Sequence, residues 1–491
     1  MSLSVPPVPT PSALTLGENI RRTLKLAVPV MIARAGLVIM VTVDSVMIGH
    51  TSTEMLAHYG VSQAPHITLL VLGIGLMAAT TILSAQAVGG RRQHEVGAIW
   101  RTALLIGLGL GLLEGFVMAL GPDILLALGQ DPELAIPGGH ALQMFGWGMP
   151  AMFMFLATTN FLEGTGRPQV GMVITLSANL IKPGLNWLLI EGNLGFPAMG
   201  AAGATLSTTI VRWLMFGAAL FYVLVMMRDR AAYGVRLTGG FPLKVAKLQL
   251  RLGLPLALSI GIQTAALALV TTFAGWLGPN SVAAYQIANN VIGFVFMLSI
   301  GLATATGVRS AQAIGRGDRP GRAIAGWLGL GMVLSLQVVI GGLIILLREP
   351  LAGVYTSDPA VLPVVVSSLM LVGVMVVLDG AHNVMQGALR AGGDVFRPLA
   401  VYIVSYWFIG VPLSYLLGND AGWGTLGLLA ATALGSLRAP TALPRPSPLL
   451  PRPGGSPRTA SVTGPSSAAT PAAGGRKPAP RASTASIGTN K

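Results

Sequence analysis

The chain has 491 residues, of which 53% are hydrophobic and 10% are charged, and its mean hydropathy is +0.70. Soluble globular domains carry charged residues at about a quarter of their positions, so this composition excludes a soluble globule and indicates an integral membrane protein. The formal net charge of +14 does not indicate nucleic-acid binding, because the segment 438–491 holds 8 Lys and Arg and no acid. The lack of cysteine excludes disulfides and thiolate metal sites.

Residues 1–23 form a polar tail rich in Pro and Ser, which we expect on the cytoplasmic side and without a cleavable signal peptide. Runs of about 20 apolar residues then predict membrane-spanning helices. The predicted spans are 24–48, 59–87, 98–120, 138–163, 168–191, 198–226, 249–276, 284–314, 322–347, 361–390 and 397–418. A twelfth span begins near Gly422 and is too short to be complete, so we expect eleven complete helices of twelve.

Basic residues gather on every second connection between these spans. They are Arg21, Arg22, Lys25, Arg91, Arg92, Arg167, Arg228, Arg230, Arg236, Lys244, Lys247, Arg316, Arg319, Arg322, Arg390 and Arg397. The alternate connections hold Arg348 and mostly acidic residues. By the positive-inside rule, the N-terminus and the linker 228–248 are cytoplasmic.

The linker separates two copies of one unit. A shift of 226 residues aligns Pro29 with Pro255, and it aligns the run SAQA at 84–87 with the same run at 310–313. A shift of 227 continues the pattern further along the chain. Six helices per copy is an even number, so both copies enter the membrane from the same side, as in transporters with parallel repeats. We therefore predict an N-lobe, 24–227, and a C-lobe, 249–437, as parallel six-helix lobes around a central cavity.

The polarity of the chain changes abruptly at Arg438, where RAPTALPRPSPLLPRPGGSPR begins a stretch with 11 prolines before the end. Proline cannot continue a helix, and this composition is typical of disorder. Two interpretations compete: a natural disordered tail, or a change of translation frame that replaced the end of the twelfth helix. We favour the frame change, because the polarity changes inside a predicted span.

Several segments, in order along residues 20–437, carry a family resemblance. They are VDSVMIGH (43–50), SAQAVGG (84–90), FLEGTGRP (161–168), LNWLLIEGNLGFPAMGAAGA (185–204), GLPLALSIGIQ (253–263), AAYQIANNV (283–291) and ALRAGGD (388–394). With them, the chain resembles the multidrug and toxic compound extrusion (MATE) transporters.

The resemblance implies a secondary antiporter that exports mostly cationic, amphipathic drugs or toxic metabolites in exchange for protons or sodium ions. It implies a monomeric, multi-pass protein of the bacterial inner membrane, with a small-molecule substrate, the lipid bilayer and no nucleic acid as partners. We expect no cofactor beyond the coupling ion. The alternative is a related lipid-linked oligosaccharide flippase, which would favour a cationic cavity. The sequence holds no HExxH pair or GxSxG elbow, so it does not indicate an enzyme.

Asp44 lies in the apolar run 29–50, where a charge is costly, so such a residue usually faces a cavity or a partner. Its repeat equivalent is Val270, so the fold itself does not need an acid there. The resemblance makes Asp44 a proton or cation site of the N-lobe. Desolvation disfavours the charged form, and neutral and charged forms that favour different conformations suffice for coupling.

Asp379 lies in the predicted tenth helix, eleven residues before the arginine of ALRAGGD. The resemblance matches it to an aspartate of the C-lobe that binds an ion or substrate. His382 and Asn383 follow three and four positions later, so they share its face or its edge. A histidine there is a candidate for proton transfer, although a hydrogen-bonded structural group is the commoner case.

Two residues depart from the sodium-coupled branch of the family. Gln263 stands where that branch would have a glutamate, and an amide cannot titrate. Lys182 stands where a metal-coordinating asparagine is expected, one turn before Asn186. An ammonium at this position competes with sodium for the same carboxylate. A pair between Lys182 and Asp44 would be the simplest way to bury both charges; the alternative is a lysine that extends outward to the membrane interface. We therefore favour protons over sodium as the coupling ion.

Further polar side chains suit the hydration of a polyspecific cavity: Asn179, Gln86, Tyr285, Gln286, Asn289 and Asn290. Arg34 and Arg212 are intramembrane cations that could be paired internally or reach an interface. Glu114 has no partner that the sequence reveals. Glu163 and Arg390 occupy matched helix ends in the two lobes, where we expect them to hold loops together.

Overall fold

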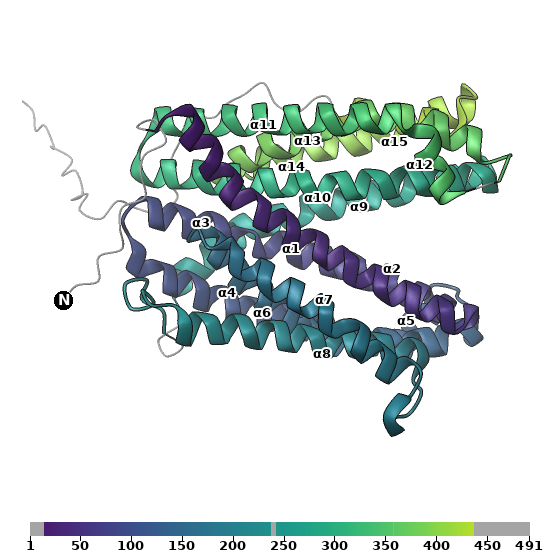
Figure 1. Ribbon diagram of the computed structural model, residues 1–491, viewed down its shortest axis with the longest axis horizontal. Helices are drawn as coiled ribbons and strands as arrows, with labels where there is room; N and C mark the ends of the chain where they lie inside the picture. The colour runs from purple at the N-terminus through teal and green to yellow at the C-terminus, as the bar shows by residue number, and fades with distance from the viewer. Residues whose placement is uncertain (1–13, 237–241, 357, 437–491) are drawn as a thin grey trace, which may run out of the picture. The chain divides into compact units, whose positions relative to one another are not determined.

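The computed structural model describes residues 14–236, 242–356 and 358–436, and the regular elements in these ranges are all helical (Figure 1). The first half contains α1 (Leu16–Thr51), α2 (Thr53–Met77), α3 (Ala79–Gly89), α4 (Val96–Ala119), α5 (Gly121–Ala127), α6 (Pro132–Gly164), α7 (Pro168–Ile190) and α8 (Gly200–Phe221). The second half contains α9 (Leu243–Trp276), α10 (Pro279–Arg316), α11 (Arg319–Leu346), α12 (Arg348–Tyr355), α13 (Leu362–Ala391), α14 (Phe396–Tyr402), α15 (Val411–Tyr415) and α16 (Gly424–Ser436). π-Helical turns extend α8 and join α14 to α15.

Within the described ranges, ten helical segments are long and apolar enough to cross a membrane, which confirms the predicted all-α membrane protein. The predicted fourth span is α6, which is not among these ten. Residues 148–164 of α6 are all buried, so other helices rather than lipid cover it. The predicted twelfth span is the 13-residue helix α16. The predicted change at Arg438 lies outside the described residues.

The two short helices α5 and α12 were not expected from the sequence, which predicted plain connections there. They begin at Gly121 and Arg348, positions that the shift of 227 pairs. In the N-lobe α5 lies in the connection between α4 and α6, and in the C-lobe α12 lies in the connection between α11 and α13. The repeat therefore extends to the connections.

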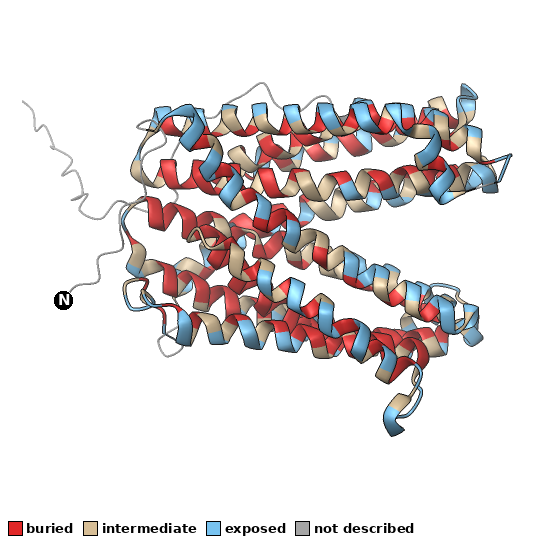
Figure 2. Cartoon of the chain, in the orientation of Figure 1, coloured by how far each residue is buried: buried red, intermediate tan, exposed pale blue. Residues whose placement is uncertain are grey.

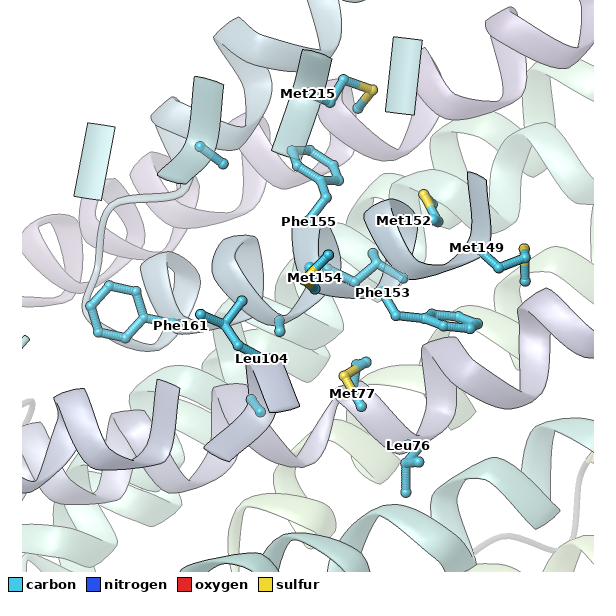
Figure 3. Close-up of a cluster of buried hydrophobic side chains, with 14 of the residues drawn as sticks. Leu76, Met77, Leu104, Met149, Met152, Phe153, Met154, Phe155, Phe161 and Met215 are labelled. Carbon is cyan, nitrogen blue, oxygen red and sulfur yellow. The ribbon is translucent and has the colours of Figure 1, made fainter. Parts of the chain in front are cut away.

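Buried apolar side chains gather mainly in two clusters, and burial follows the helix faces that pack against one another (Figure 2). The larger cluster belongs almost wholly to the N-lobe and is rich in methionine and phenylalanine from α6, as Figure 3 shows for Met149, Phe153 and Phe161. Methionine is flexible and fills irregular gaps between helices. The second cluster belongs to the C-lobe and includes residues of α9, α10, α13 and α16.

The repeated SAQA segments meet one another across the contact between the lobes, where α3 packs against α10. A Cβ at Gly89 would lie 2.1 Å from the carbonyl oxygen of Gln312, and a Cβ at Gly315 would lie 2.1 Å from that of Gln86. These four positions are two repeat-related pairs, so the contact is reciprocal. Glycine is needed on both sides because the backbones approach too closely for any side chain.

Polar contacts also join the two lobes near this contact between α3 and α10. Arg309 of α10 donates to the backbone oxygen of Asn19, at 2.8 Å, and to the side-chain oxygens of Asn19 and Thr23 at the start of α1. Gln86 donates to the carbonyl oxygen of Ala391, at 2.7 Å. All three polar side chains of the Arg309 cluster are at least nine-tenths buried, so this junction excludes water.

Candidate functional site

Helix α1 carries the candidate carboxylate, Asp44, into the interior of the N-lobe. The helix starts at a capping box between Thr15 and Glu18 and packs against α7 and α10. Only 2% of Asp44 is exposed, although the apolar residues beside it in sequence, Val41 and Val46, are exposed. Asp44 therefore points away from the helix surface that lipid can reach.

Helix α7 supplies the two closest partners of this carboxylate. Lys182 and Asn186 are four residues apart, so they share one face of the helix. The Nζ atom of Lys182 lies 2.8 Å from Oδ1 of Asp44, and Nδ2 of Asn186 donates to the same oxygen at 2.8 Å. Lys182 is completely buried, so its stem does not reach a membrane interface.

Two other helices complete the surroundings of Asp44. Thr208 of α8 donates to Oδ2 at 3.1 Å, and Tyr59 of α2 donates to Oδ2 at 3.3 Å. The ammonium of Lys182 also donates to the hydroxyl oxygens of Thr208, at 2.6 Å, and of Ser207, at 3.2 Å. Four helices thus converge on one buried ion pair.

The carboxylate of Asp44 is held by donors only: an ammonium, an amide and two hydroxyl groups. A buried ion pair must recover a large desolvation cost, which it does only with close geometry and further hydrogen bonds. Here the opposite charges cancel and the carboxylate accepts four bonds. The arrangement supplies donors to both oxygens of the carboxylate and places a cation beside it.

The candidate acid of the C-lobe has fewer partners. Oδ2 of Asp379 on α13 accepts from Nδ2 of Asn383 at 2.9 Å, and the same amide donates to the backbone oxygen of Asp379 at 2.8 Å. Asp379 is only half-buried, and no basic side chain within ion-pair distance of it is found among the described residues. This carboxylate therefore keeps an oxygen that is open to an incoming cation.

Other predicted C-lobe residues contact different groups. His382 lies 2.7 Å from Nε2 of Gln386, whose oxygen accepts from Arg390 at 2.5 Å, and its ring packs edge-on against Tyr402. The amide of Gln263 donates to the hydroxyl oxygen of Tyr406 at 2.9 Å. The structure thus brings Asn383, but not His382, into hydrogen-bond contact with Asp379.

The remaining cavity candidates are scattered. Asn179 donates to the backbone oxygen of Gly36, and Gln86 lies at the junction of the lobes. Tyr285 is buried in the C-lobe cluster. Gln286 and Asn290 are exposed and Asn289 is partly exposed, and Asn290 accepts from Tyr355 at 3.1 Å. They form no common site with Asp44.

Sequence reasoning missed the hydroxyl groups around Asp44. Ser207 and Thr208 stand in a Thr- and Ser-rich stretch of α8, a common pattern in membrane helices, so nothing in the sequence marked them. Tyr59 is the repeat equivalent of Tyr285 under the shift of 226, a match that does not indicate a contact with Asp44. Its role follows from the packing of α2 beside α8, which sequence spacing alone does not give.

Two further intramembrane cations of the N-lobe, Arg34 and Arg212, have internal partners, whereas the acid Glu114 does not within the described ranges. Arg34 lies 3.5 Å from Oε1 of Glu163, so Glu163 joins α6 to α1. Arg212 lies 2.9 Å from Nε2 of His66. Oε2 of Glu114 is buried with no hydrogen-bond partner in the described part of the chain.

Comparison with known proteins places these features in a family. The MatE family model matches residues 29–188 and 255–416, segments that start at the repeat-related prolines. The chain is 31% identical over 419 residues to a probable multidrug resistance protein NorM of Caulobacter vibrioides, covering 85% of this chain and 88% of the relative. It is 31% identical over 425 residues to the multidrug resistance protein PmpM of Pseudomonas aeruginosa, covering 85% and 87%. A crystal structure of MATE in the bent conformation has the same fold, with a TM-score of 0.79 at 19% identity, covering 86% of this chain and 93% of that one.

Proposed function

Because this chain belongs to the MatE family of membrane transporters, we propose that it is a proton-driven antiporter that exports organic, mostly cationic compounds. The relatives are named multidrug resistance proteins, which supports drugs or toxic metabolites as substrates. Their bacterial origin supports the inner membrane as its location, and the basic connections support a cytoplasmic N-terminus. Protons would enter the cell as the substrate leaves it.

The observation that carries the choice of coupling ion is the contact between Lys182 and Asp44. A sodium ion needs several oxygen ligands around it, but Oδ1 of Asp44 faces two nitrogen groups, from Lys182 and Asn186. The ammonium already supplies one positive charge to this carboxylate. A proton, in contrast, needs only one lone pair of the carboxylate and no coordination shell.

Protonation of Asp44 would change the contacts of four helices at once. A neutral acid carries an O–H group that must donate, but the four groups around Asp44 are themselves donating to it. Neutralisation also removes the charge that holds Lys182. The ammonium keeps hydroxyl acceptors on Ser207 and Thr208 of α8. The hold of α7 and α8 on α1 is therefore weaker in the protonated state.

This difference is sufficient for coupling. A bound proton shifts a conformational equilibrium only by its differential affinity for the two states, and in this conformation four donors already occupy the oxygens of Asp44 that would take the proton. A conformation in which α1 has separated from Lys182 accepts the proton more readily. Proton entry thus drives the lobes from one conformation to the other.

Asp379 is proposed as the second charged contact, for an ion or for the substrate cation. It is more exposed than Asp44 and has one amide partner, Asn383. The tyrosines Tyr402 and Tyr406 are buried and stack on each other with ring centroids 5.5 Å apart. The flippase alternative would require unpaired cations that line the cavity. Lys182 is paired with Asp44 and Arg34 with Glu163, and Arg212 is buried against His66.

The experiment is export of a fluorescent organic cation from everted membrane vesicles, under an imposed proton gradient or an imposed sodium gradient. We expect transport with protons alone, loss of transport in Asp44→Asn, and retention in Glu114→Gln. Glu114 is the matched control because it is a buried N-lobe carboxylate that, among the described residues, contacts neither Asp44 nor the four side chains that bind Asp44. Transport that responds to sodium and not to protons would contradict the proposal.

A further inference from the structure

A line of side-chain contacts leads from Asp44 across α2 to a second buried cation on α8. Tyr59 donates to Oδ2 of Asp44 at 3.3 Å, and the phenol oxygen accepts from Nε2 of Gln63. Oε1 of Gln63 lies 3.1 Å from Nδ1 of His66, and Nε2 of His66 lies 2.9 Å from NH2 of Arg212. The contacts therefore form one unbroken chain, Arg212–His66–Gln63–Tyr59–Asp44.

The chemistry of the two ends fixes the direction of every bond in this chain. A guanidinium can only donate, so Nε2 of His66 must accept from Arg212 and the ring must be neutral. Its proton is then on Nδ1, which donates to Oε1 of Gln63. The other end of this amide donates to the oxygen of Tyr59, whose own proton goes to Asp44. All four bonds point toward the carboxylate.

The packing around Arg212 and His66 leaves little freedom to reverse this order. The His66 ring stacks on Phe145 with centroids 3.9 Å apart and an interplanar angle of 2°, and the guanidinium lies 5.6 Å from the same ring. Arg212 also approaches the sulfur of Met149, at 3.6 Å. Within the described ranges, no carboxylate lies within ion-pair distance of Arg212. His66 is therefore its strongest acceptor, and losing that bond would leave a buried donor unsatisfied.

We propose that Arg212 and His66 are positioning residues for the coupling step, which fix Tyr59 as a donor to Asp44 and so set the pH at which the transporter takes up its proton. The proposal rests on the proposed role of Asp44. A phenol whose oxygen already accepts from Gln63 is poorly placed to accept the proton of a neutral Asp44. The chain thus stabilises the ionised acid and withholds an acceptor from the protonated one.

The other charged and titratable groups near these helices do not share the task. Besides Tyr59 on α2, Asp44 faces Lys182 of α7 and, through the chain, Arg212 of α8. On the remaining helices packed against α1 and α2, such groups contact other residues: Arg309 of α10 binds the start of α1, Glu163 of α6 binds Arg34, and Glu54 and His58 of α2 lie 4.0 Å from each other. Oε2 of Glu114 on α4 has no hydrogen-bond partner among the described residues, and Lys244, Lys247 and Arg251 of α9 are exposed.

The test is the pH dependence of proton-driven export in vesicles, with the pH of half-maximal transport measured for each variant. Gln63→Met interrupts the chain with a side chain of similar size and no change of charge, and Tyr59→Phe removes its last bond. Each variant weakens the bond that stabilises the ionised form of Asp44, so Asp44 takes up its proton at a lower proton concentration. The pH of half-maximal transport therefore rises. We expect about one pH unit for Tyr59→Phe, the size of one hydrogen bond to a charged group, and a smaller shift in the same direction for Gln63→Met.

Two further variants make the outcome decisive. Arg212→Met should shift the midpoint upward as well. Gln143→Met should leave it unchanged, because Gln143 is an N-lobe glutamine whose amide binds the backbone oxygen of Ala119 and, in the described part of the chain, no other group. Protein levels and elution on gel filtration check that each variant folds. Unchanged midpoints for Gln63→Met and Tyr59→Phe, with transport abolished in Asp44→Asn, would overturn the inference and leave the proposed function intact. Proton-driven transport that persists in Asp44→Asn would overturn both.

Discussion

The ammonium nitrogen of Lys182 lies 2.8 Å from Oδ1 of Asp44, and neither side chain is more than 2% exposed. This contact between opposite charges joins α1 and α7, two helices that are far apart in sequence. Each residue alone would be a costly group inside a membrane protein. Together they form a neutral pair whose stability depends on the ionisation of the acid. This dependence makes the pair suitable for coupling.

Removal of the cation should destabilise the protein more than removal of the whole pair. Lys182→Met leaves Asp44 without its charge partner, which costs about 3–5 kcal/mol for a buried pair. The double variant Asp44→Asn with Lys182→Met has no uncompensated charge and should recover most of that loss. Thermal unfolding of the purified variants, followed by loss of the monodisperse peak, measures the order. Equal destabilisation in the single and double variants would contradict the account of the pair.

Asp379→Asn should affect substrate recognition more than proton use. Asp379 is half-buried and bound by one amide, so an incoming organic cation can reach it. We expect the KM for a cationic substrate to rise by about tenfold, with little change for a neutral substrate and an unchanged pH midpoint. Export assays over a range of substrate concentrations measure this split. A shifted pH midpoint with unchanged KM would assign Asp379 to proton coupling instead.

The sequence predicted the membrane fold and the repeat, because apolar periodicity, basic connections and the paired SAQA segments are local signals. It also placed Lys182 and Asn186 on the face that meets Asp44, since helical spacing links them. Asn179 was expected to hydrate the cavity, but the close approach of α1 at Gly36 offers its amide a backbone oxygen. His382 similarly turns to Gln386 rather than to Asp379.

What the sequence did not predict depends on packing between distant helices. Tyr59 and Thr208 reach Asp44, and Ser207 reaches Lys182, only because α2 packs against α1 and α8 packs against α7. The direction of the chain through Gln63 and His66 follows from a contact with Arg212, 146 residues from the histidine. Spacing along one helix contains no information on such contacts.

Gly89→Ala should disturb the contact between the lobes. The added Cβ would lie 2.1 Å from the carbonyl oxygen of Gln312, a backbone atom that cannot move aside cheaply. We expect greater labelling of a cysteine introduced at the junction, for example at Ser310, and reduced transport. Gly109→Ala is the control, because nothing lies within 4 Å of a Cβ there. Equal labelling in the two variants would show that the close approach of α3 and α10 does not protect the contact between the lobes from the labelling reagent.

Arg309→Met should weaken the same junction by another route. The guanidinium loses its bonds to Asn19 and Thr23, so the start of α1 is no longer held against α10. Labelling of a cysteine at Thr23 should rise several-fold, and Arg309→Lys should fall between the variant and the parent chain, since lysine retains a charge and donors. If the cysteine is labelled no faster in Arg309→Met than in the parent chain, the Arg309 contacts do not hold the start of α1 against α10.

In the proposed cycle Asp44 takes up the coupling proton and releases Lys182, and infrared difference spectroscopy of the purified transporter in lipid tests this step most directly. Lowering the pH should produce a carbonyl stretching band of a protonated carboxylic acid, and substrate should reverse it. The band should be absent in Asp44→Asn and present in Glu114→Gln. A band that persists in Asp44→Asn, or a spectrum that responds to sodium instead of to pH, would contradict the account.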